Sequence, residues 1–409
     1  MNKVESALVI GGGVAGPVTA LALRKAGIDA IVYEAYPSTA DGIGGTLAIA
    51  PNGLAALDIV GARDTATAGA QPITATVMSF GGRSVALPPV AGLPPMRLLQ
   101  RAELYRALYD VAVADGIRFE HGKRLESAED GADGVTARFA DGSTEKADVL
   151  IGADGIHSTV RGLIDPDAPG PGYTGLLGLE AVVDRPVEVE TGTMCFAFGK
   201  RAYYLYWRRP DGRTGFGANL PRERPMRLTE ARAVPREEWL RRLRETYGDD
   251  DPGGDLVRHL DPDRLTVSGS LHLMPSVPRW YRGRLVLVGD AVHAPSNSSG
   301  QGASLAIESA IELARCLRDL PGPESAFAVY ERLRRPRVES IAARAAKINH
   351  MKAPGPLTGA VLPVLMRLLL KTAMRPEKTL GPQQRHRIDW AAPVTSAAPP
   401  GNPVGRPVS

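Results

Sequence analysis

The segment from residue 4 to residue 34 constrains the fold more than any other part of the chain. Residues 4–10 form an apolar run that predicts a buried strand. A Gly-x-Gly-x-x-Gly turn follows at residues 11–16, and residues 17–26 carry apolar side chains at helical spacing. Residues 30–34 predict a second strand that ends at Glu34. This strand–turn–helix–strand order predicts a parallel, doubly wound α/β domain.

The glycine turn has the chemistry of a dinucleotide site. Gly11 permits a tight turn, Gly13 lets the backbone approach a pyrophosphate, and Gly16 lets helix and strand pack closely. The start of the helix then offers free N–H groups to phosphates. Glu34 stands at the end of the second strand, where an acid can hold ribose hydroxyls. The residues predicted to contact the dinucleotide here are Gly11, Gly13, Val14, Ala15, Gly16 and Glu34.

Length, composition and charge narrow the class of protein. A chain of 409 residues predicts two domains, or one domain with a second lobe. The formal charge of +4 suits an anionic cofactor but is too small to indicate nucleic acid. The only two cysteines, Cys195 and Cys316, form no metal or disulfide pattern, so we expect no metal site and a reducing, cytoplasmic location. Residues 1–6 carry no secretory signal, and the apolar segment 359–370 is too short to span a bilayer.

A second motif lies at residues 147–161, where an apolar strand leads into an Asp-Gly turn and a helix start. Asp154 and Ser158 are candidate helix caps, and Arg161 is placed to bind an anion or Asp154. Taken alone, an Asp-Gly turn followed by a capping serine is common. This motif indicates a binding site only in combination with the other motifs.

A third motif is more specific. Residues 285–288 predict a strand that ends at Gly289 and Asp290, and a loop then runs to Gly300-Gln301-Gly302 at the start of a helix. A carboxylate at the end of a strand can accept hydrogen bonds from a polyol chain. The later glycines let backbone N–H groups face a developing negative charge, with help from the helix dipole.

The rest of the chain predicts an α/β first domain, an α+β second lobe and a long C-terminal helix. Residues 172–273 alternate as strands rich in aromatic residues, interrupted by one helix at 235–247. Residues 99–114, 303–317 and 325–351 predict helices, the last with Pro336 inside, and residues 146–151 predict one strand. The expected division is 1–72, 96–165 and 277–322 for the first domain, 73–95 and 166–276 for the second lobe, 323–390 for C-terminal helices, and 391–409 for a disordered tail.

Together, the three motifs resemble the group A flavoprotein monooxygenases with the p-hydroxybenzoate hydroxylase fold. Residues 43–47 are similar to the compact, tetracycline-inactivating members, and residues 330–337 resemble the family's C-terminal helix motif. Two positions depart from the family pattern: Ala35 stands where Arg usually follows the acid, and Asn297 stands where the loop usually has Pro. The resemblance implies a Rossmann-like FAD-binding domain, and as cofactor-binding residues Gly11, Gly13, Val14, Ala15, Gly16, Glu34, Gly45, Thr46, Arg101, Asp154, Gly155, Arg161, Gly289, Asp290, Gly300, Gly302 and Ala303.

The resemblance also implies the reaction. NAD(P)H reduces FAD, a flavin C4a-hydroperoxide forms with oxygen, and one oxygen atom enters an aromatic or polycyclic small molecule, such as a natural product or a xenobiotic. The protein is expected to act as a monomer or homodimer without nucleic acid or stable membrane insertion. No side-chain base follows from the sequence. His293, His272 and Tyr204 are polar candidates for a catalytic role, although a lone histidine is more often structural.

Alternatives to the monooxygenase are another flavin oxidoreductase, such as a halogenase or dehydrogenase, and a non-catalytic FAD-binding protein. The halogenase Trp-x-Trp-x-Ile-Pro motif is not evident, and residues 206–210 do not match it. The strand at 202–207 leaves a further choice open. Tyr204 and Tyr206 share one face and Tyr203 and Trp207 the other, and either face can line a substrate site or fill a core.

Overall fold

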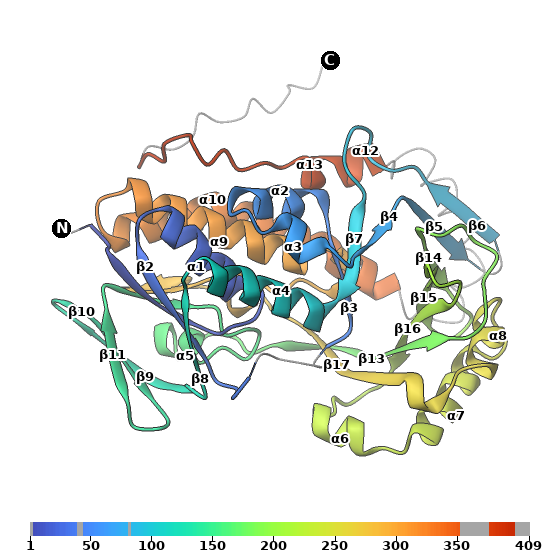
Figure 1. Ribbon diagram of the computed structural model, residues 1–409. Helices are drawn as coiled ribbons and strands as arrows, with labels where there is room; N and C mark the ends of the chain where they lie inside the picture. The colour runs from blue at the N-terminus through green and yellow to red at the C-terminus, as the bar shows by residue number, and fades with distance from the viewer. Residues whose placement is uncertain (1–2, 39–43, 81–82, 352–375, 397–409) are drawn as a thin grey trace, which may run out of the picture.

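A computed structural model describes residues 3–38, 44–80, 83–351 and 376–396 (Figure 1). The first unit is built on a six-stranded sheet with the order β18-β19-β12-β1-β2-β8. Its parallel strands are β1 (Ser6–Ile10), β2 (Asp29–Glu34), β8 (Arg118–His121), β12 (Val149–Gly152) and β19 (Leu285–Leu287), and β18 (Tyr281–Arg282) pairs antiparallel at the edge. This arrangement confirms the α/β fold expected from the first strand–turn–helix–strand unit.

Helices cover one side of this sheet. Figure 1 shows α1 (Ala15–Lys25), α4 (Arg101–Ala114), α9 (Gly302–Asp319) and α10 (Pro323–Met351) stacked together above the strands. An antiparallel sheet of β9 (Leu125–Gly131), β10 (Gly134–Phe139) and β11 (Thr144–Ala147) lies at the other side. Strands β1 and β12 are almost fully buried between these layers, as expected of a parallel sheet covered on both faces.

The second unit contains a seven-stranded sheet with the order β17-β13-β16-β15-β14-β5-β6. Its long strands are β13 (Gly172–Val183), β16 (Thr214–Pro221) and β17 (Leu265–Leu273). The others are β14 (Thr193–Phe198), β15 (Tyr203–Arg208), β5 (Ala75–Phe80) and β6 (Arg83–Leu87). Helices α6 (Leu228–Ala233), α7 (Arg236–Tyr247) and α8 (Gly253–Arg258) belong to this unit at the lower right of Figure 1.

A small sheet stands between the two units (Figure 1). It consists of β3 (Thr46–Ile49), β7 (Met96–Gln100) and β4 (Gln71–Ile73), with β7 in the centre. Two short helices, α2 (Pro51–Ile59) and α3 (Arg63–Thr67), connect β3 to β4. The small sheet therefore carries the chain from the first unit into β5 and β6 of the second and back to α4.

The C-terminal part crosses the top of the helical layer in Figure 1. Two short helices, α12 (Pro376–Thr379) and α13 (Gly381–Gln384), precede an extended segment. Arg315 and Arg318 of α9 donate hydrogen bonds to the carbonyls of Ala392 and Trp390 over 2.9 and 2.6 Å. Residues 391 and 392 of the predicted tail therefore lie beside α9. The described residues include no helix long and apolar enough to cross a membrane.

Some predicted element boundaries differ from the structure. Residues 146–151 are not one strand, because the chain passes from β11 to β12 at Asp148, whose carboxylate accepts hydrogen bonds from the N–H groups of Glu5 and Ser6. The helix expected from residue 99 begins at Arg101, since Leu99 and Gln100 end β7. The apolar segment 359–370 lies outside the described residues.

Candidate functional site

The three motifs meet at the carboxyl ends of β1, β12 and β19. A Cβ atom on Gly11, whose φ is +107°, would lie 2.5 Å from the carbonyl oxygen of Ala153, next to Asp154. A Cβ on Gly16 would lie 1.9 Å from the carbonyl oxygen of Gly11. A larger residue at position 11 would therefore push the turn away from the end of β12, and one at position 16 would push α1 away from the turn. These close approaches leave a compact glycine turn in front of the N-terminus of α1.

Glu34 and Tyr105 flank this turn. The Glu34 carboxylate accepts a hydrogen bond from Gly12 N–H over 2.7 Å and another from Tyr36 N–H over 2.9 Å. The phenol ring of Tyr105 lies within 3.8 Å of the place where a Gly13 Cβ would stand. Burial raises the pKa of Tyr105, and the charges of Arg101, Asp290 and Glu34 also influence it. Residues from three distant parts of the sequence thus surround one space.

The Asp154 motif is organised by its own hydrogen bonds. Asp154 accepts from Ser158 Oγ and from the N–H groups of Thr159 and Val160, so it caps the start of α5 (Thr159–Ile164). Burial raises the pKa of Asp154, and these hydrogen bonds oppose the shift. Arg161 is buried and donates to the carbonyls of Ala291 and Ile156 over 2.9 and 3.0 Å. Arg161 therefore connects this motif to the Gly289–Asp290 turn.

The Gly289–Asp290 turn lies between α1 and α9. Gly289 has φ of +63°, and a Cβ there would stand 2.8 Å from the Cβ of Ala15 and 3.3 Å from that of Ala306. The Asp290 side chain is exposed to solvent, but the protein atoms around it still raise its pKa, against the charge of Arg101. Asp290 is therefore accessible to a ligand at the end of β19.

The loop before α9 is held from behind by buried polar groups. The Asn52 side-chain amide donates to Gln301 Oε1 over 2.9 Å and to Glu308 Oε1 over 2.7 Å. Ala50 N–H donates to Ser304 Oγ over 3.0 Å, and a Cβ on Gly53 would stand 2.6 Å from that oxygen. Gly300, Gly302 and Ala303 are partly or fully exposed in front of these contacts. The N-terminus of α9 is thus fixed against the start of α2.

Glu308 is the centre of a buried ion-pair network. It contacts Arg334 over 2.8 Å and Arg337 over 2.8 Å, and the side chains of Glu308 and Arg334 are only 1% and 2% exposed. Burial acts to raise the pKa of Glu308, but Arg334 and Arg337 lower it to about 2. Two arginines of the long helix α10 therefore point inward, toward α9. Pro336 lies between the two arginines.

The second unit meets the first at Glu180. This residue of β13 accepts hydrogen bonds from Thr46 N–H and Thr46 Oγ1, both over 2.8 Å. Gln100 donates to the same Thr46 oxygen over 2.9 Å. Burial raises the pKa of Glu180, while Thr46 and the charge of Arg101 oppose the shift. Arg101 N–H in turn donates to the Gly45 carbonyl over 3.1 Å, so Gly45, Thr46, Arg101 and Glu180 form one cluster.

The two faces of the seven-stranded sheet differ. Tyr204 and Tyr206 belong to a core with α7 and α8, and the Tyr204 ring lies 5.3 Å from that of Tyr247. The register of the strands puts Glu180, Gly217, Leu205 and Phe196 in one row on the opposite face. Tyr204 and Tyr206 therefore fill this core, and Tyr203 and Trp207 of the other face are also buried, in two smaller clusters.

The two candidate histidines have different surroundings. His293 is 4% exposed, and its Nε2 lies 2.8 Å from Ser309 Oγ. Burial, together with Arg334, lowers the pKa of His293 to about 3, so the ring is neutral at ordinary pH. His272 is half-buried, and its ring lies 6.0 Å from that of His157 in the Asp154 motif. The structure does not bring Tyr204, His272 and His293 together with Asp290 as one constellation.

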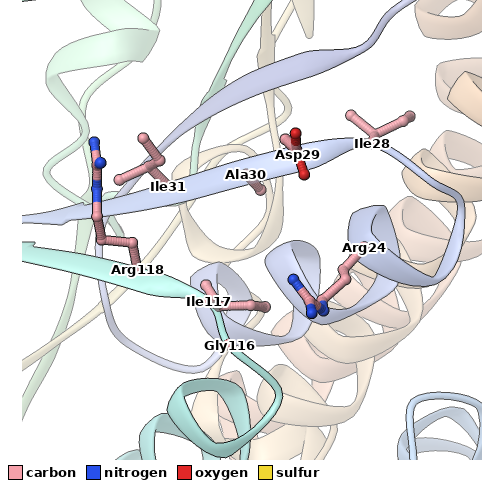
Figure 2. A pocket seen from close by; sticks show the side chains of 8 residues that line it. All are labelled: Arg24, Ile28, Asp29, Ala30, Ile31, Gly116, Ile117 and Arg118. Carbon is pink, nitrogen blue, oxygen red and sulfur yellow. The ribbon is translucent and has the colours of Figure 1, made fainter.

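A groove at the other end of β2 is separate from these motifs. Figure 2 shows Arg24, Asp29 and Arg118 at its wall, and its volume is about 240 Å³. Asp29 begins β2, whereas Glu34 ends it. Arg24 and Arg118 already pair with Asp115 and Glu120 over 3.2 and 3.3 Å. The groove therefore has no connection to the glycine turn.

Tyr105 and Glu180 are site residues that the sequence interpretation missed. Tyr105 looks like an ordinary amphipathic helix position. Glu180, however, is the one charged residue in the apolar stretch 175–183, and that contrast signals a special role for its side chain. Its partner Thr46 is 134 positions away, which no local pattern reveals.

Comparisons with known proteins agree with this geometry. The family described as FAD binding domain matches residues 4–345. The chain is 31% identical to the FAD-dependent urate hydroxylase of Klebsiella pneumoniae, over 85% of this chain and 91% of the relative. It is 30% identical to the 3-amino-4-hydroxybenzoate 2-monooxygenase of Streptomyces cremeus, over 83% of this chain and 86% of the relative.

Solved structures show the same fold. The Klebsiella pneumoniae HpxO complexed with FAD and uric acid is 26% identical, with a TM-score of 0.78 over 93% of this chain and 96% of that one. The tetracycline destructase Tet(51) shares the fold, with a TM-score of 0.61 and 21% identity over 86% of this chain and 92% of that one. The residues present also fit FAD, because the glycine turn, which admits no Cβ at Gly11 or Gly16, lies near both the strand-end acid Glu34 and the solvent-accessible acid Asp290. The chain therefore belongs to the FAD binding domain family and is an FAD-dependent monooxygenase.

Proposed function

We propose that this protein hydroxylates an electron-rich aromatic or polycyclic small molecule, with NAD(P)H as the electron donor. The observation that carries the proposal is the convergence of the Gly11, Asp154 and Asp290 motifs beside a largely apolar sheet face. FAD, when bound and reduced, supplies the oxygen-activating chemistry. The chain's own residues bind and orient the cofactor and substrate and exclude water.

Each part of the surface suits one part of FAD. The glycine turn with Gly11, Gly13 and Gly16, which includes Val14 and Ala15, is proposed to offer N–H groups to the diphosphate. Glu34 is proposed to accept hydrogen bonds from the adenosine ribose, and Asp290 from the ribityl hydroxyls. The proposed flavin end lies near Gly45, Thr46, Arg101 and the N-terminus of α9. There, N–H groups of Gly300, Gly302 and Ala303 would stabilise negative charge on the pyrimidine ring.

The Asp154 motif has a supporting role in this proposal. Asp154 and Gly155 form the turn that backs the glycine loop, and Arg161 holds the Gly289–Asp290 turn through the Ala291 carbonyl. Because Arg161 is buried and bonded to two carbonyls, we propose that it positions the site and does not bind a phosphate itself.

The proposed substrate surface is the face of the seven-stranded sheet that carries Glu180. Its neighbours Leu205 and Phe196 are apolar and partly buried, which suits a flat ring. By their names, the two relatives act on urate and on 3-amino-4-hydroxybenzoate. No side chain is assigned as a general base. We further propose that the protein works in the cytoplasm.

The proposal is tested with the purified protein. Bound FAD is identified from its spectrum, and NADH and NADPH oxidation is followed with phenols, indoles and polycyclic ketones. Oxygen-18 from O2 should appear in the product of the compound that stimulates oxidation. A protein whose flavin is bleached by neither nucleotide, or whose products take oxygen only from water, would refute the proposal. The same products distinguish hydroxylation from halogenation and dehydrogenation.

A further inference from the structure

Glu180 is the one charged residue that the central strands β13, β16, β15 and β14 place on the proposed substrate face, whose other side chains are mostly apolar, with Asn219 as a further buried polar residue. The strand register puts Gly217 directly opposite Glu180, then Leu205, Phe196 and Met78 in the same row. The central strands β13, β16, β15 and β14 place no Lys or Arg on this face. An acid here is costly to desolvate, so it needs partners in the folded state.

One oxygen of the carboxylate has such partners. Oε2 accepts hydrogen bonds from Thr46 N–H and Thr46 Oγ1, and Gln100 fixes the Thr46 hydroxyl from behind. Gly45 makes room for the other oxygen, since a Cβ at that position would stand 2.1 Å from Glu180 Oε1. Among the described residues, no hydrogen-bond donor reaches Oε1. The carboxylate is thus held in one orientation with one acceptor oxygen still available.

The position of this oxygen relates it to the proposed flavin end. Arg101, which lies against the backbone of Gly44, is close enough for its charge to act on Glu180, Asp290 and Tyr105 alike. Glu180 is therefore where the substrate face of the sheet reaches the residues proposed to surround the flavin. A substrate ring lying on Leu205 and Phe196 would present its polar substituent to this acid.

We propose that Glu180 is a specificity-determining residue, which selects aromatic substrates with a hydrogen-bond donor, such as an amine, ring N–H or hydroxyl, and disfavours a carboxylate at that position. This inference rests on the proposed function, because it takes the Glu180 face as the substrate surface. A fixed carboxylate rewards a donor with a charge-assisted hydrogen bond and repels a second carboxylate.

Glu180→Gln is the matched substitution. Glutamine keeps a carbonyl oxygen that can accept from Thr46, so the contact between the sheet and β3 survives while the charge is lost. Thr46→Val is the control, because it removes the hydroxyl bond and leaves the charge of Glu180. A purely structural role would make the two variants alike.

Binding is measured with the FAD-loaded proteins and three probes that differ only in one group: 4-(aminomethyl)phenol, 4-(hydroxymethyl)phenol and 4-hydroxybenzoate. Dissociation constants come from equilibrium dialysis and from the change in the flavin spectrum. The wild type should bind the amine at least about tenfold more tightly than the carboxylate. Glu180→Gln should reduce this ratio at least about tenfold, and Thr46→Val should change it less than about threefold.

Equal amine-to-carboxylate ratios in the wild type and Glu180→Gln would overturn the proposal. A wild type that prefers the carboxylate, or that shows no measurable binding of the amine, would also overturn it. FAD affinity and oxygen-dependent NAD(P)H oxidation are measured on the same preparations. If these are absent from the wild type, the proposed function itself has failed, which is a separate result.

Discussion

Replacing Glu308 by Gln should destabilise the protein far more than an ordinary loss of one ion pair. Glu308 is fully buried, and it faces both Arg334 and Arg337. Glutamine would leave two arginine charges without a counter-charge, and Arg334 has no access to water that could solvate it. Removing one partner of a buried pair typically costs about 3–5 kcal/mol. In a chain of 409 residues that unfolds as one unit, this corresponds to a fall in Tm of about 3–6 °C.

The matched control is Glu331→Gln. Glu331 pairs with Arg335 on the same helix over 2.6 Å, but the two side chains are 24% and 22% exposed. A helical pair of this kind contributes only about 0.3–0.5 kcal/mol. Urea unfolding of the apoproteins, which removes the contribution of bound FAD, gives the free energies of unfolding. If the free energies of unfolding of Glu308→Gln and Glu331→Gln differed by less than about 1 kcal/mol, the buried network would not contribute the stability predicted for it.

The difference in stability between the wild type and Glu308→Gln should depend on pH. The pKa of Glu308 is lowered from 4.5 to about 2, so its ionised form is favoured by folding. Its contribution is therefore complete above pH 4.5 and disappears as the pH falls towards 2. The difference in stability between wild type and Glu308→Gln should shrink over that interval. A difference that stays constant between neutral pH and the lowest pH at which the fold survives would contradict the assigned charge.

Three further substitutions examine other parts of the site. Asp290→Asn should weaken FAD binding about 10–150-fold, because a charged hydrogen-bond acceptor is lost. Fluorescence titration of the apoprotein with FAD measures the Kd. An unchanged Kd would contradict the proposed contact between Asp290 and the ribityl chain. Gly11→Ala should abolish FAD retention, because its Cβ would stand 2.5 Å from a carbonyl oxygen. The control is Gly27→Ala, where φ is +77° and no atom lies within 4 Å of the added Cβ. It should retain FAD and lose only about 1 kcal/mol of unfolding free energy. If both lose FAD equally, the close approach is not the cause. The His293 pKa is lowered from 6.5 to about 3, so this ring alone should remove about 2 kcal/mol of unfolding free energy between pH 7.5 and pH 5, since the unfolded chain takes up the proton. His293→Asn should lose less over that interval, and equal pH slopes would argue against a buried neutral ring.

The first unit was predictable because its determinants are local. An apolar run, a glycine turn and a helical period within residues 4–34 specify β1, α1 and β2, and the structure has them within two residues of the predicted bounds. The end of β2 at Glu34 follows from the same pattern. The functional class followed from three motifs that had to be taken together, since each is common alone.

The polar contacts that hold the site were not predictable from such patterns. Asn52 and Glu308 are 256 positions apart, and Thr46 and Glu180 are 134 apart. Local periodicity says which side chains share a face, but it does not say what that face meets. The strand at 203–208 shows this limit, because alternation separates Tyr204 from Tyr203 but does not say that Tyr204 packs against α7 while Tyr203 packs in a smaller cluster with Phe80 and Phe198.

The charged groups around the proposed FAD site suit different parts of FAD. Asp290 and Glu34 are acceptors, which suits the hydroxyls of the ribityl chain and ribose but not a diphosphate. The diphosphate must then be bound by N–H groups, and the glycine turn before α1 is where they are offered. A Cβ at Gly11 or Gly16 would disturb that turn, and we propose that its geometry, more than a lysine or arginine, provides the anion site. Arg101 lies instead among Tyr105, Asp290 and Glu180, at the end where we propose that the flavin and the substrate face meet. A cation there can balance negative charge on a reduced flavin, while Glu180 keeps that same cation from attracting an anionic substrate.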